Sequence, residues 1–223
     1  MKPETIVVVA GGHPLGGSVP GSAVPSLPDG AMVIAADGGV DRALALGLHV
    51  DLAIGDFDSV SDAGLAAAET AGARIERHPA TKDATDLELA LDAAVALHPA
   101  RVVVVGSDGG RLDHLLGSVL LLADERYAAI EIDACLGDAH VHVIRGTRAL
   151  LGTPGDLLTL LPVHGAAQGV TTEGLEYPLR DETLPPGTSR GVSNVFAASE
   201  ARITVDRGCL LAIRPAPEPE GSL

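Results

Sequence analysis

The first half of the chain alternates between short apolar runs and stretches with helical periodicity. Thr5 to Ala10 is a nearly continuous β-branched run, which is typical of a strand buried on both of its faces. Further short apolar runs predict strands at 31–36, 50–54, 73–76 and 102–105. Because helical patterns separate these runs, the sequence predicts right-handed βαβ units and a mostly parallel sheet.

The helices between these strands are predicted from the spacing of apolar residues. A short stripe and an alanine-rich helix come first, and Thr85 with Glu88 has the spacing of a capping box at the start of a third helix. A fourth helix is expected from Arg111 to about Ala123. We expect its apolar residues to face the protein interior, and these are Leu112, Leu115, Leu116, Val119, and Leu122 or Leu120.

The pattern changes after about residue 130, where helical stretches no longer separate the apolar runs. Gly, Pro and Thr fill the gaps, which is typical of a small antiparallel β unit, a sandwich or a barrel. The later strand candidates are 130–132, 140–144, 157–161, 168–171, 202–205 and 209–213. The predicted fold class is therefore α/β, with an N-terminal, mostly parallel α/β sandwich domain over 1–145, a smaller C-terminal antiparallel β-sandwich domain over 146–215, and a flexible tail over 216–223.

Composition and charge narrow the choice of partners. The 223-residue chain has 46% hydrophobic and 20% charged residues, which is enough apolar material for a substantial core. Its formal net charge of −15 argues against a nucleic-acid surface, and with two Tyr, two Phe and no Trp we expect no stacking platform for bases. A polyanionic substrate would need a metal ion or a local cationic group beside it.

Cellular location is predicted from the cysteines and from the length of the apolar runs. Cys135 and Cys209 are far apart and form no C-x-x-C motif, which indicates two reduced thiols and neither a zinc site nor a disulfide framework. The run from Ile6 to Ala10 is too short for a signal sequence, and no stretch approaches the length of a membrane span. We expect a cytoplasmic protein that makes no contact with a membrane.

Two acidic side chains follow the strand predicted at 50–54. Asp56 and Asp58 are separated by one residue, so in an extended segment they face the same side while Phe57 turns back into the protein. Two such carboxylates suit Mg²⁺, which prefers oxygen ligands and keeps some waters that a phosphate can replace. For an isolated motif of this length, the alternative is a loop with two solvated aspartates.

Six aspartates occupy similar places in the predicted sheet, each just after a strand or in the first turn of the next helix. These places converge beyond the carboxyl ends of parallel strands, where ligands bind in such sheets. A divalent cation with a nucleotide phosphate chain explains why so many carboxylates gather there. Turn formation at Asp37 and helix capping at Thr85 to Glu88 remain as alternatives. The six are Asp37, Asp56, Asp58, Asp83, Asp86 and Asp113.

Two glycine-rich segments accompany these acids. Gly11 to Gly17 follows the first strand, but it lacks both G-x-G-x-x-G and G-K-[ST], so phosphate contact there stays open. The second segment runs from Gly106 to His114. In it, Arg111 either pairs with Asp113 or binds phosphate through its planar guanidinium group, and we interpret His114 as a structural hydrogen-bonding residue.

Together these motifs resemble those of the thiamine pyrophosphokinase family, whose members transfer pyrophosphate from ATP to thiamine and produce thiamine diphosphate and AMP. The resemblance follows the same order over nearly the whole chain, and the blocks are specific in combination. The four main blocks are Ala-Asp-Gly-Gly at 36–39, the run 51–59 around Asp56, the run 82–91 that begins Lys-Asp-Ala-Thr-Asp, and Gly-Gly-Arg-Leu-Asp-His at 109–114. A looser block comprises 174–179, Gly187 and Ser193-Asn194.

The resemblance implies a set of site residues and a homodimer with active sites between its subunits. Mg²⁺ would be held by Asp56, Asp58, Asp83 and Asp86. The expected catalytic residues are Asp56, Asp58, Asp86, Asp113 and Arg111, with Asp86 or Asp113 accepting or orienting the proton of the substrate hydroxyl. The expected residues for binding ATP and thiamine are Asp37, Thr85, Arg111, Tyr177, Ser193 and Asn194, of which the last two contribute to the thiamine pocket.

Two positions depart from the family pattern. Tyr177 stands where many relatives have Trp, and a Tyr ring keeps an aromatic face of smaller area for stacking on the pyrimidine. Ser118 stands where many bacterial relatives have Asn. Neither change removes an expected metal ligand, so both bear on affinity more than on the chemistry.

Other functions remain to be weighed against this one. The nearest is a pyrophosphokinase for another hydroxymethyl heterocycle, such as a pterin, although the 174–194 block favours thiamine. A regulatory nucleotide-binding module without turnover is a second alternative, and the full set of aspartates with Arg111 speaks against it. A dinucleotide oxidoreductase is excluded because the first strand is not followed by G-x-G-x-x-G.

Overall fold

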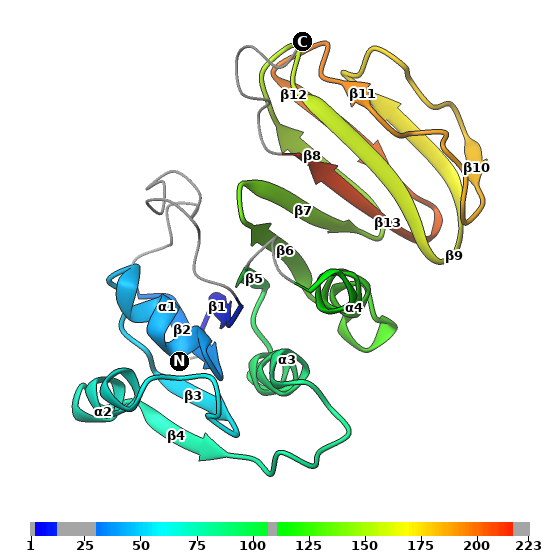
Figure 1. Cartoon of the computed structure of the whole chain (residues 1–223). Helices are drawn as coiled ribbons and strands as arrows, with labels where there is room; N and C mark the ends of the chain where they lie inside the picture. Colours follow the sequence, from blue (N-terminus) through cyan, green and yellow to red (C-terminus); the bar gives the residue numbers. More distant parts are fainter. Residues whose placement is uncertain (1–2, 13–29, 107–110, 216–223) are drawn as a thin grey trace. The chain divides into compact units, whose positions relative to one another are not determined.

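The computed structural model of the chain describes residues 3–12, 30–106 and 111–215 (Figure 1). It divides into two compact units. Unit 1 comprises Met1–Leu121 with Ala129–Gly137, and unit 2 comprises Leu122–Ala128 with Asp138–Leu223. The glycine-rich segments at 13–17 and 109–110 and the tail at 216–223, all singled out in the sequence, lie outside the described residues. Among the described helices, none combines the length and the apolar character needed to cross a bilayer.

Unit 1 is built on a parallel sheet, which confirms the predicted α/β class. The strands pair in the order β4-β3-β2-β1-β5-β6, and each pair is parallel. Their near-continuous β-branched sequences match this arrangement, because Ile6 to Val9 and Val102 to Val104 are almost completely buried. The strands are β1 (Thr5–Ala10), β2 (Met32–Ala36), β3 (Leu52–Gly55), β4 (Arg74–Arg77), β5 (Arg101–Gly106) and β6 (Glu131–Leu136).

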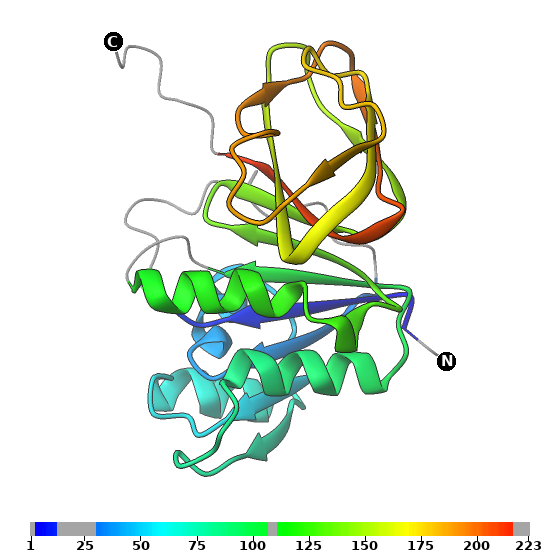
Figure 2. The same cartoon turned by 90° about the vertical axis from the view of Figure 1, so that its right-hand side faces the viewer.

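In the described part of unit 1, four helices connect these strands and cover both faces of the sheet. Figures 1 and 2 show α1 and α2 on one face, and α3 and α4 on the other. The start of α3 follows the predicted capping box, because the Thr85 side chain accepts a hydrogen bond of 3.2 Å from the Glu88 backbone N–H. The helices are α1 (Gly39–Ala45), α2 (Asp62–Thr70), α3 (Asp86–Ala96) and α4 (Leu112–Leu122), and a 3₁₀ turn, η1 (Glu125–Tyr127), follows.

The predicted orientation of α4 is wrong. Leu112, Leu116 and Leu120 are 67, 55 and 44% exposed, and Leu115 and Val119 are only half-buried. Leu122 is the buried residue of this helix, as one of the two expected alternatives. The three exposed leucines are four residues apart, so they form a stripe along one side of the helix. We call Leu112, Leu116 and Leu120 the α4 stripe.

Unit 2 is antiparallel, again as predicted. Its strands pair in the order β7-β13-β9-β12-β8, and β10 and β11 also pair with β9. The predicted strands at 157–161 and 168–171 are one strand of 17 residues, β9, which exchanges hydrogen bonds with β11, β13, β10 and β12 along its length. The strands are β7 (Ala139–Ile144), β8 (Thr147–Leu151), β9 (Leu157–Glu173), β10 (Glu182–Leu184), β11 (Asn194–Val195), β12 (Glu200–Thr204) and β13 (Arg207–Arg214).

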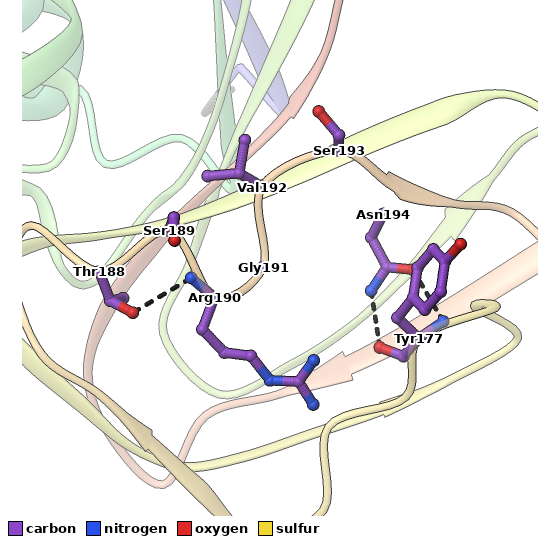
Figure 3. Close-up of a pocket in the computed structure, with 8 residues that line it drawn as sticks. All are labelled: Tyr177, Thr188, Ser189, Arg190, Gly191, Val192, Ser193 and Asn194. Atoms are coloured by element: carbon purple, nitrogen blue, oxygen red, sulfur yellow. Dashed lines mark hydrogen bonds between the residues drawn. The ribbon is translucent and has the colours of Figure 1, made fainter.

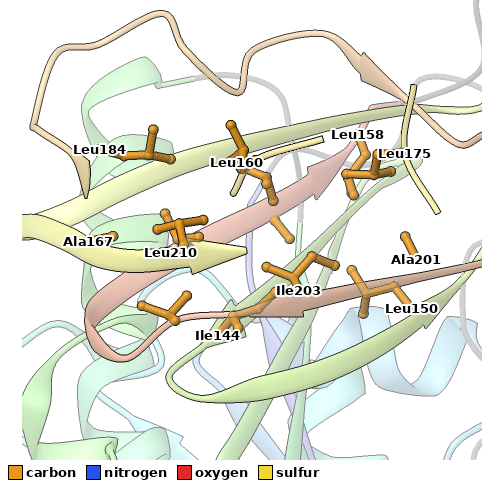
Figure 4. Close-up of a cluster of buried hydrophobic side chains, with 14 of the residues drawn as sticks. Ile144, Leu150, Leu158, Leu160, Ala167, Leu175, Leu184, Ala201, Ile203 and Leu210 are labelled. Atoms are coloured by element: carbon orange, nitrogen blue, oxygen red, sulfur yellow. The ribbon is translucent and has the colours of Figure 1, made fainter. Parts of the chain in front are cut away.

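An apolar cluster fills the interior of unit 2 (Figure 4). It draws alternate residues from β9, such as Leu158 and Leu160, because successive side chains of a strand point to opposite faces. Phe196 is fully buried within the cluster, and its ring leaves no room for a side chain at Gly152. The cluster gives unit 2 a core of its own, as a separate domain requires.

Candidate functional site

Three carboxylates meet at one edge of the unit 1 sheet. Asp37 follows β2, Asp56 follows β3 and Asp86 is the first residue of α3. Each offers one oxygen, and the three oxygens lie within 4.8 Å of one another. Because β2 and β3 are parallel neighbours, their carboxyl ends bring Asp37 and Asp56 together, as expected for ligand positions in such a sheet. We call Asp37, Asp56 and Asp86 the carboxylate group.

Backbone geometry at two positions lets these side chains approach. Asp37 has a φ of +46°, a left-handed conformation that Asp tolerates better than most residues, and its N–H donates to Ile54 O at 2.9 Å. Gly55 has a φ of +150°, and a Cβ atom there would lie 2.9 Å from Asp86 Oδ1 and 3.2 Å from Asp37 Cβ. Gly55 therefore leaves open the space that both carboxylates occupy.

The extended geometry predicted for the Asp56–Asp58 motif is wrong. Phe57 has a φ of +63°, so the alternation of side chains along an extended strand does not apply to this segment. Phe57 does turn back and packs on the unit 1 core, with the Arg77 guanidinium 5.0 Å from the centroid of its ring. Asp58 is exposed and accepts a hydrogen bond of 2.8 Å from the Ser59 hydroxyl. It is not a member of the carboxylate group.

A lysine ammonium group lies among these carboxylates. Lys82 Nζ is 2.7 Å from Asp86 Oδ1 and 3.4 Å from Asp56 Oδ2, and the Lys82 side chain is only 14% exposed. Burial lowers the pKa of Lys82, but the bonds to Asp86 and Asp56 outweigh it, so the pKa lies above its usual value. Lys82 belongs to a motif recognised in the sequence, yet no role was predicted for it. The available signal was that Lys82 directly precedes a run of acidic residues that contains no other cation.

The carboxylate group suits a divalent cation. Its oxygens are hard ligands at close spacing, and Asp37 Oδ1 is buried with no hydrogen-bond partner among the described residues. A buried carboxylate oxygen without a partner is costly, and a cation at this place would remove that cost. The sequence placed Asp37 at the same edge of the sheet but gave it a role in substrate binding. The structure groups it with two of the expected metal ligands.

The other expected ligands of unit 1 lie apart from this group. Asp83 is exposed and is not a member of it. Thr85 is also exposed, and its hydroxyl oxygen serves as the cap of α3. The structure thus brings together three of the six acidic positions predicted to converge, and the metal roles of Asp58 and Asp83 stay predictions.

Arg111 pairs with Asp113, one of the two alternatives that the sequence left open. Arg111 Nη2 is 2.6 Å from Asp113 Oδ2, and Arg111 Nε is 3.2 Å from Asp113 Oδ1. This pairing lowers the pKa of Asp113 to about 2, mainly through the hydrogen bond from Arg111. Both side chains are about two-thirds exposed, so a phosphate arriving from solvent can compete for the guanidinium.

A second candidate site is a pocket of about 410 Å³ in unit 2 (Figure 3). Its lining includes all three residues that the resemblance assigned to thiamine, Tyr177, Ser193 and Asn194. The remaining lining residues are Thr188, Ser189, Arg190, Gly191 and Val192. The pocket is therefore made by one loop, 188–194, facing the segment that carries Tyr177.

Asn194 holds the two sides of the pocket together. It is 2% exposed, and its Oδ1 accepts hydrogen bonds from the N–H groups of Tyr177 (3.1 Å) and Val195 (2.9 Å). Its Nδ2 donates to Tyr177 O at 2.8 Å, and Figure 3 shows the side chain turned toward the Tyr177 backbone. The Asn194 amide therefore positions Tyr177, a residue that lines the pocket and is 57% exposed.

The loop is also fixed to β9 and to β10. Gly191 has a φ of +99° and its carbonyl accepts a hydrogen bond from the Leu160 N–H at 2.9 Å, an approach that leaves no room for a side chain. Arg190 forms two hydrogen bonds to Glu182, of 2.8 and 3.0 Å, and this pairing lowers the pKa of Glu182. Arg190 was not singled out in the sequence, and its place between Gly187 and Ser193 was the available signal.

Both units match models of known protein domains. Residues 26–134 match the model described as "Thiamin pyrophosphokinase, catalytic domain". Residues 141–210 match "Thiamin pyrophosphokinase, vitamin B1 binding domain". The two matches together span well over half of the chain.

Whole-chain comparisons agree with these matches. The chain is 28% identical to "Thiamine pyrophosphokinase" of Bacillus subtilis (strain 168) over 225 residues, which is 95% of this chain and 98% of the relative. A crystal structure of thiamine pyrophosphokinase from Bacillus subtilis has a TM-score of 0.81 at 27% identity and covers 96% of this chain and 99% of its own. A thiamin pyrophosphokinase family protein from Enterococcus faecalis has a TM-score of 0.80 at 25% identity, with 96 and 100% covered.

Proposed function

The chain belongs to the thiamin pyrophosphokinase family, and from this premise we propose how its residues carry out the reaction. Its activity is the transfer of pyrophosphate from ATP to the hydroxyl of thiamine, which produces thiamine diphosphate and AMP. It is therefore a diphosphotransferase that uses ATP as co-substrate. A pterin pyrophosphokinase is not favoured, because residues 141–210 match a vitamin B1 binding domain. A module without turnover is not favoured either, since residues 26–134 match the catalytic domain.

We propose that the carboxylate group holds Mg²⁺, with Asp56 and Asp86 as ligands and Asp37 as a further one. The observation that supports this is the spacing of the three oxygens within 4.8 Å, together with the buried Asp37 Oδ1. When bound, Mg²⁺ neutralises phosphate charge and orients the polyphosphate chain. Asp58 and Asp83 are exposed and are not members of the carboxylate group, and we propose that they bind through water or after a local rearrangement.

The chain's own residues then align the reactants. The thiamine hydroxyl oxygen bonds to the β-phosphorus of ATP, the bond to the α-phosphate oxygen breaks, and AMP leaves. We propose that Asp86 orients the hydroxyl proton, because it belongs to the carboxylate group, whereas Asp113 lies in an exposed pair with Arg111. Arg111 would exchange Asp113 for a phosphate oxygen, and Thr85 lies at the N-terminus of α3, where backbone N–H groups favour an anion.

We propose that the unit 2 pocket binds thiamine. Its volume of about 410 Å³ is in the range of small-molecule sites, and its polar loop surrounds one exposed aromatic ring. Tyr177 offers that ring for stacking on the pyrimidine or for contact with the cationic thiazolium. Ser193 and Asn194 shape the pocket, Ser193 through its N–H bond of 3.0 Å to Thr159 Oγ1.

We also propose that the protein is a homodimer. The α4 stripe supports this, because three exposed leucines on one side of a helix are typical of a surface covered by another chain. Active sites between subunits would follow the family resemblance. A cytoplasmic location stays a prediction, and the buried thiols of Cys135 and Cys209, which form no disulfide, are compatible with it.

The activity and its substrate are tested together by measuring AMP release. Purified protein is incubated with ATP and MgCl₂, with and without thiamine, and the products are identified by mass spectrometry. We expect AMP only when thiamine is present, with thiamine diphosphate in equal amount. AMP formation with a hydroxymethyl pterin and none with thiamine would overturn the substrate. No AMP with either acceptor would overturn the activity.

A further inference from the structure

A lysine contacts two carboxylates of the proposed metal site. Lys82 Nζ contacts Asp86 Oδ1 at 2.7 Å and Asp56 Oδ2 at 3.4 Å, so it lies between two members of the carboxylate group. All three side chains are largely shielded, with exposures of 14, 25 and 16%. This is a different environment from the exposed ion pairs elsewhere in the protein, such as Arg202 with Glu200, which are both 49% exposed.

The contact is not an ordinary pair along a helix. Lys82 and Asp86 are four residues apart, but Lys82 precedes α3, which begins at Asp86. Lys82 lies in the segment between β4 and α3, and its side chain reaches Asp56, which is 26 residues away in the sequence. A lysine ammonium is a compact point charge on a flexible stem with no fixed binding geometry. It is therefore a counter-ion that can leave without rearrangement of the backbone.

Charge and hydrogen bonding leave the site incomplete with lysine alone. Three carboxylates carry a formal charge of −3 and one ammonium compensates only part of it. Lys82 forms ion pairs with Asp56 and Asp86, but Asp37 Oδ1 and Asp86 Oδ1 are both buried with no hydrogen-bond partner among the described residues. A divalent cation bound to all three oxygens would provide what the ammonium does not. It would also repel the ammonium, because the two positive charges would share the same ligands.

We propose that Lys82 is an exchangeable counter-ion of this site: its ammonium stabilises Asp56 and Asp86 in the metal-free protein and is displaced when a divalent cation binds. The inference rests on the proposed magnesium site. Before the metal binds, the Lys82 ammonium offsets the repulsion among the carboxylates. When the metal and the polyphosphate bind, the Lys82 ammonium is released beside the site. A phosphate oxygen can accept its hydrogen bonds there. Lys82 is thus a positioning residue that couples metal binding to phosphate binding.

The test compares Mg²⁺ binding by wild-type protein and by Lys82→Met, which keeps the apolar stem and removes the charge. Thermal unfolding is measured in EDTA and over a series of MgCl₂ concentrations, without ATP or thiamine. If the ammonium competes with the metal, the variant unfolds at a lower temperature in EDTA but binds Mg²⁺ about tenfold more tightly, as expected for a coupling of ordinary size. Arg202→Met is the matched control, because it removes one positive charge from an exposed pair in unit 2 and should leave Mg²⁺ binding within about twofold of wild type.

Each outcome has one meaning. Unchanged or weaker Mg²⁺ binding by Lys82→Met, with a wild type that responds to Mg²⁺, would overturn the exchange and leave the metal site standing. If Mg²⁺ changes the unfolding temperature of neither the wild type nor Asp56→Asn, the metal site is overturned, and the exchange with it. If Lys82→Met does not fold in EDTA, Lys82→Gln is measured in its place, since it keeps a hydrogen-bond donor without the charge. Tighter Mg²⁺ binding by Lys82→Gln supports the exchange, and unchanged binding contradicts it.

Discussion

Gly55 lies directly against Asp86: a Cβ atom on residue 55 would be 2.9 Å from Asp86 Oδ1. The same atom would be 3.2 Å from Asp37 Cβ, so one missing side chain makes room for two carboxylates of the group. Gly55 is the last residue of β3 and immediately precedes Asp56, the third carboxylate. The glycine of this motif is therefore a steric requirement of the carboxylate group as well as a backbone requirement.

Gly55→Ala is expected to disrupt the carboxylate group. Its methyl group would push the Asp86 and Asp37 side chains away, so we expect turnover and Mg²⁺-dependent stabilisation to be lost. Gly72→Ala is the matched control, because Gly72 also has a positive φ (+103°) but has no atom within 4 Å of the added Cβ. Both variants should lose about 1–3 kcal/mol of stability from backbone strain. Turnover by Gly55→Ala equal to that of Gly72→Ala would contradict the steric role.

Asp56→Asn is expected to abolish turnover and leave the fold intact. The amide has nearly the same shape as the carboxylate, but it is a weaker ligand for Mg²⁺ and a weaker partner for Lys82. AMP release and circular dichroism of the variant test both parts. Asp62→Asn, on an exposed residue at the start of α2, serves as the control and should keep wild-type turnover. Unchanged turnover by Asp56→Asn would remove Asp56 from the metal site.

The local parts of this fold were predictable, and the parts that depend on distant contacts were not. The bounds of β1 and the start of α3 follow from a β-branched run and from a capping box, both of which act over a few residues. Strand β9 was predicted as two strands because Pro162 and Gly165 interrupt its apolar pattern. In the structure that stretch continues across the interruption, since β13 pairs with it on both sides of Gly165.

The candidate site also combines features that follow from local sequence with features that depend on distant contacts. The convergence of Asp37, Asp56 and Asp86 at one edge of the sheet was predictable, because each follows a strand or begins the next helix. The place of Lys82 does not, because its contact with Asp56 joins residues 26 positions apart. The exposed side of α4 was also misjudged, because periodicity identifies an apolar stripe but does not say what covers it.

Asn194→Ala is expected to raise the KM for thiamine more than the KM for ATP. The change removes three hydrogen bonds and leaves the N–H and C=O of Tyr177 unpaired, which should cost about 2–3 kcal/mol of stability. Without this clamp, the Tyr177 ring is less well positioned beside the pocket. Thr147→Ala is the control, since Thr147 is an exposed residue of β8 whose hydroxyl hydrogen bonds to that of Thr204, and it does not line the pocket. Equal effects on both KM values would show that Asn194 stabilises the fold and has no specific role in thiamine binding.

Cys135 and Cys209 are expected to resist thiol reagents in the folded protein. Burial raises the pKa of both thiols, to about 11 for Cys135, and the reactive species is the thiolate. The raised pKa keeps Cys135 protonated through neutral pH, so its thiolate should form only as the pH rises toward about 11. Labelling with a disulfide reagent near neutral pH, with and without denaturant, measures this. Rapid labelling of the native protein would contradict the burial of these residues.

Leu116→Glu is expected to weaken the proposed dimer. Leu116 is the middle residue of the α4 stripe, so a charge there would be buried without a partner when two copies associate. We expect the wild type to sediment as a dimer. The dissociation constant of the variant dimer should be about a hundredfold higher. Leu151→Glu is the control, because Leu151 is 73% exposed but belongs to β8 and is not a member of the stripe.

The same variant decides whether the dimer matters for catalysis. If active sites lie between subunits, the specific activity of Leu116→Glu should fall on dilution and recover at high protein concentration, because mass action restores the dimer. The wild type and Leu151→Glu should keep constant activity over the same range. A monomeric wild type with full activity would refute the dimer. A variant that is monomeric yet fully active would support the proposed interface. It would also show that each chain forms a complete active site by itself.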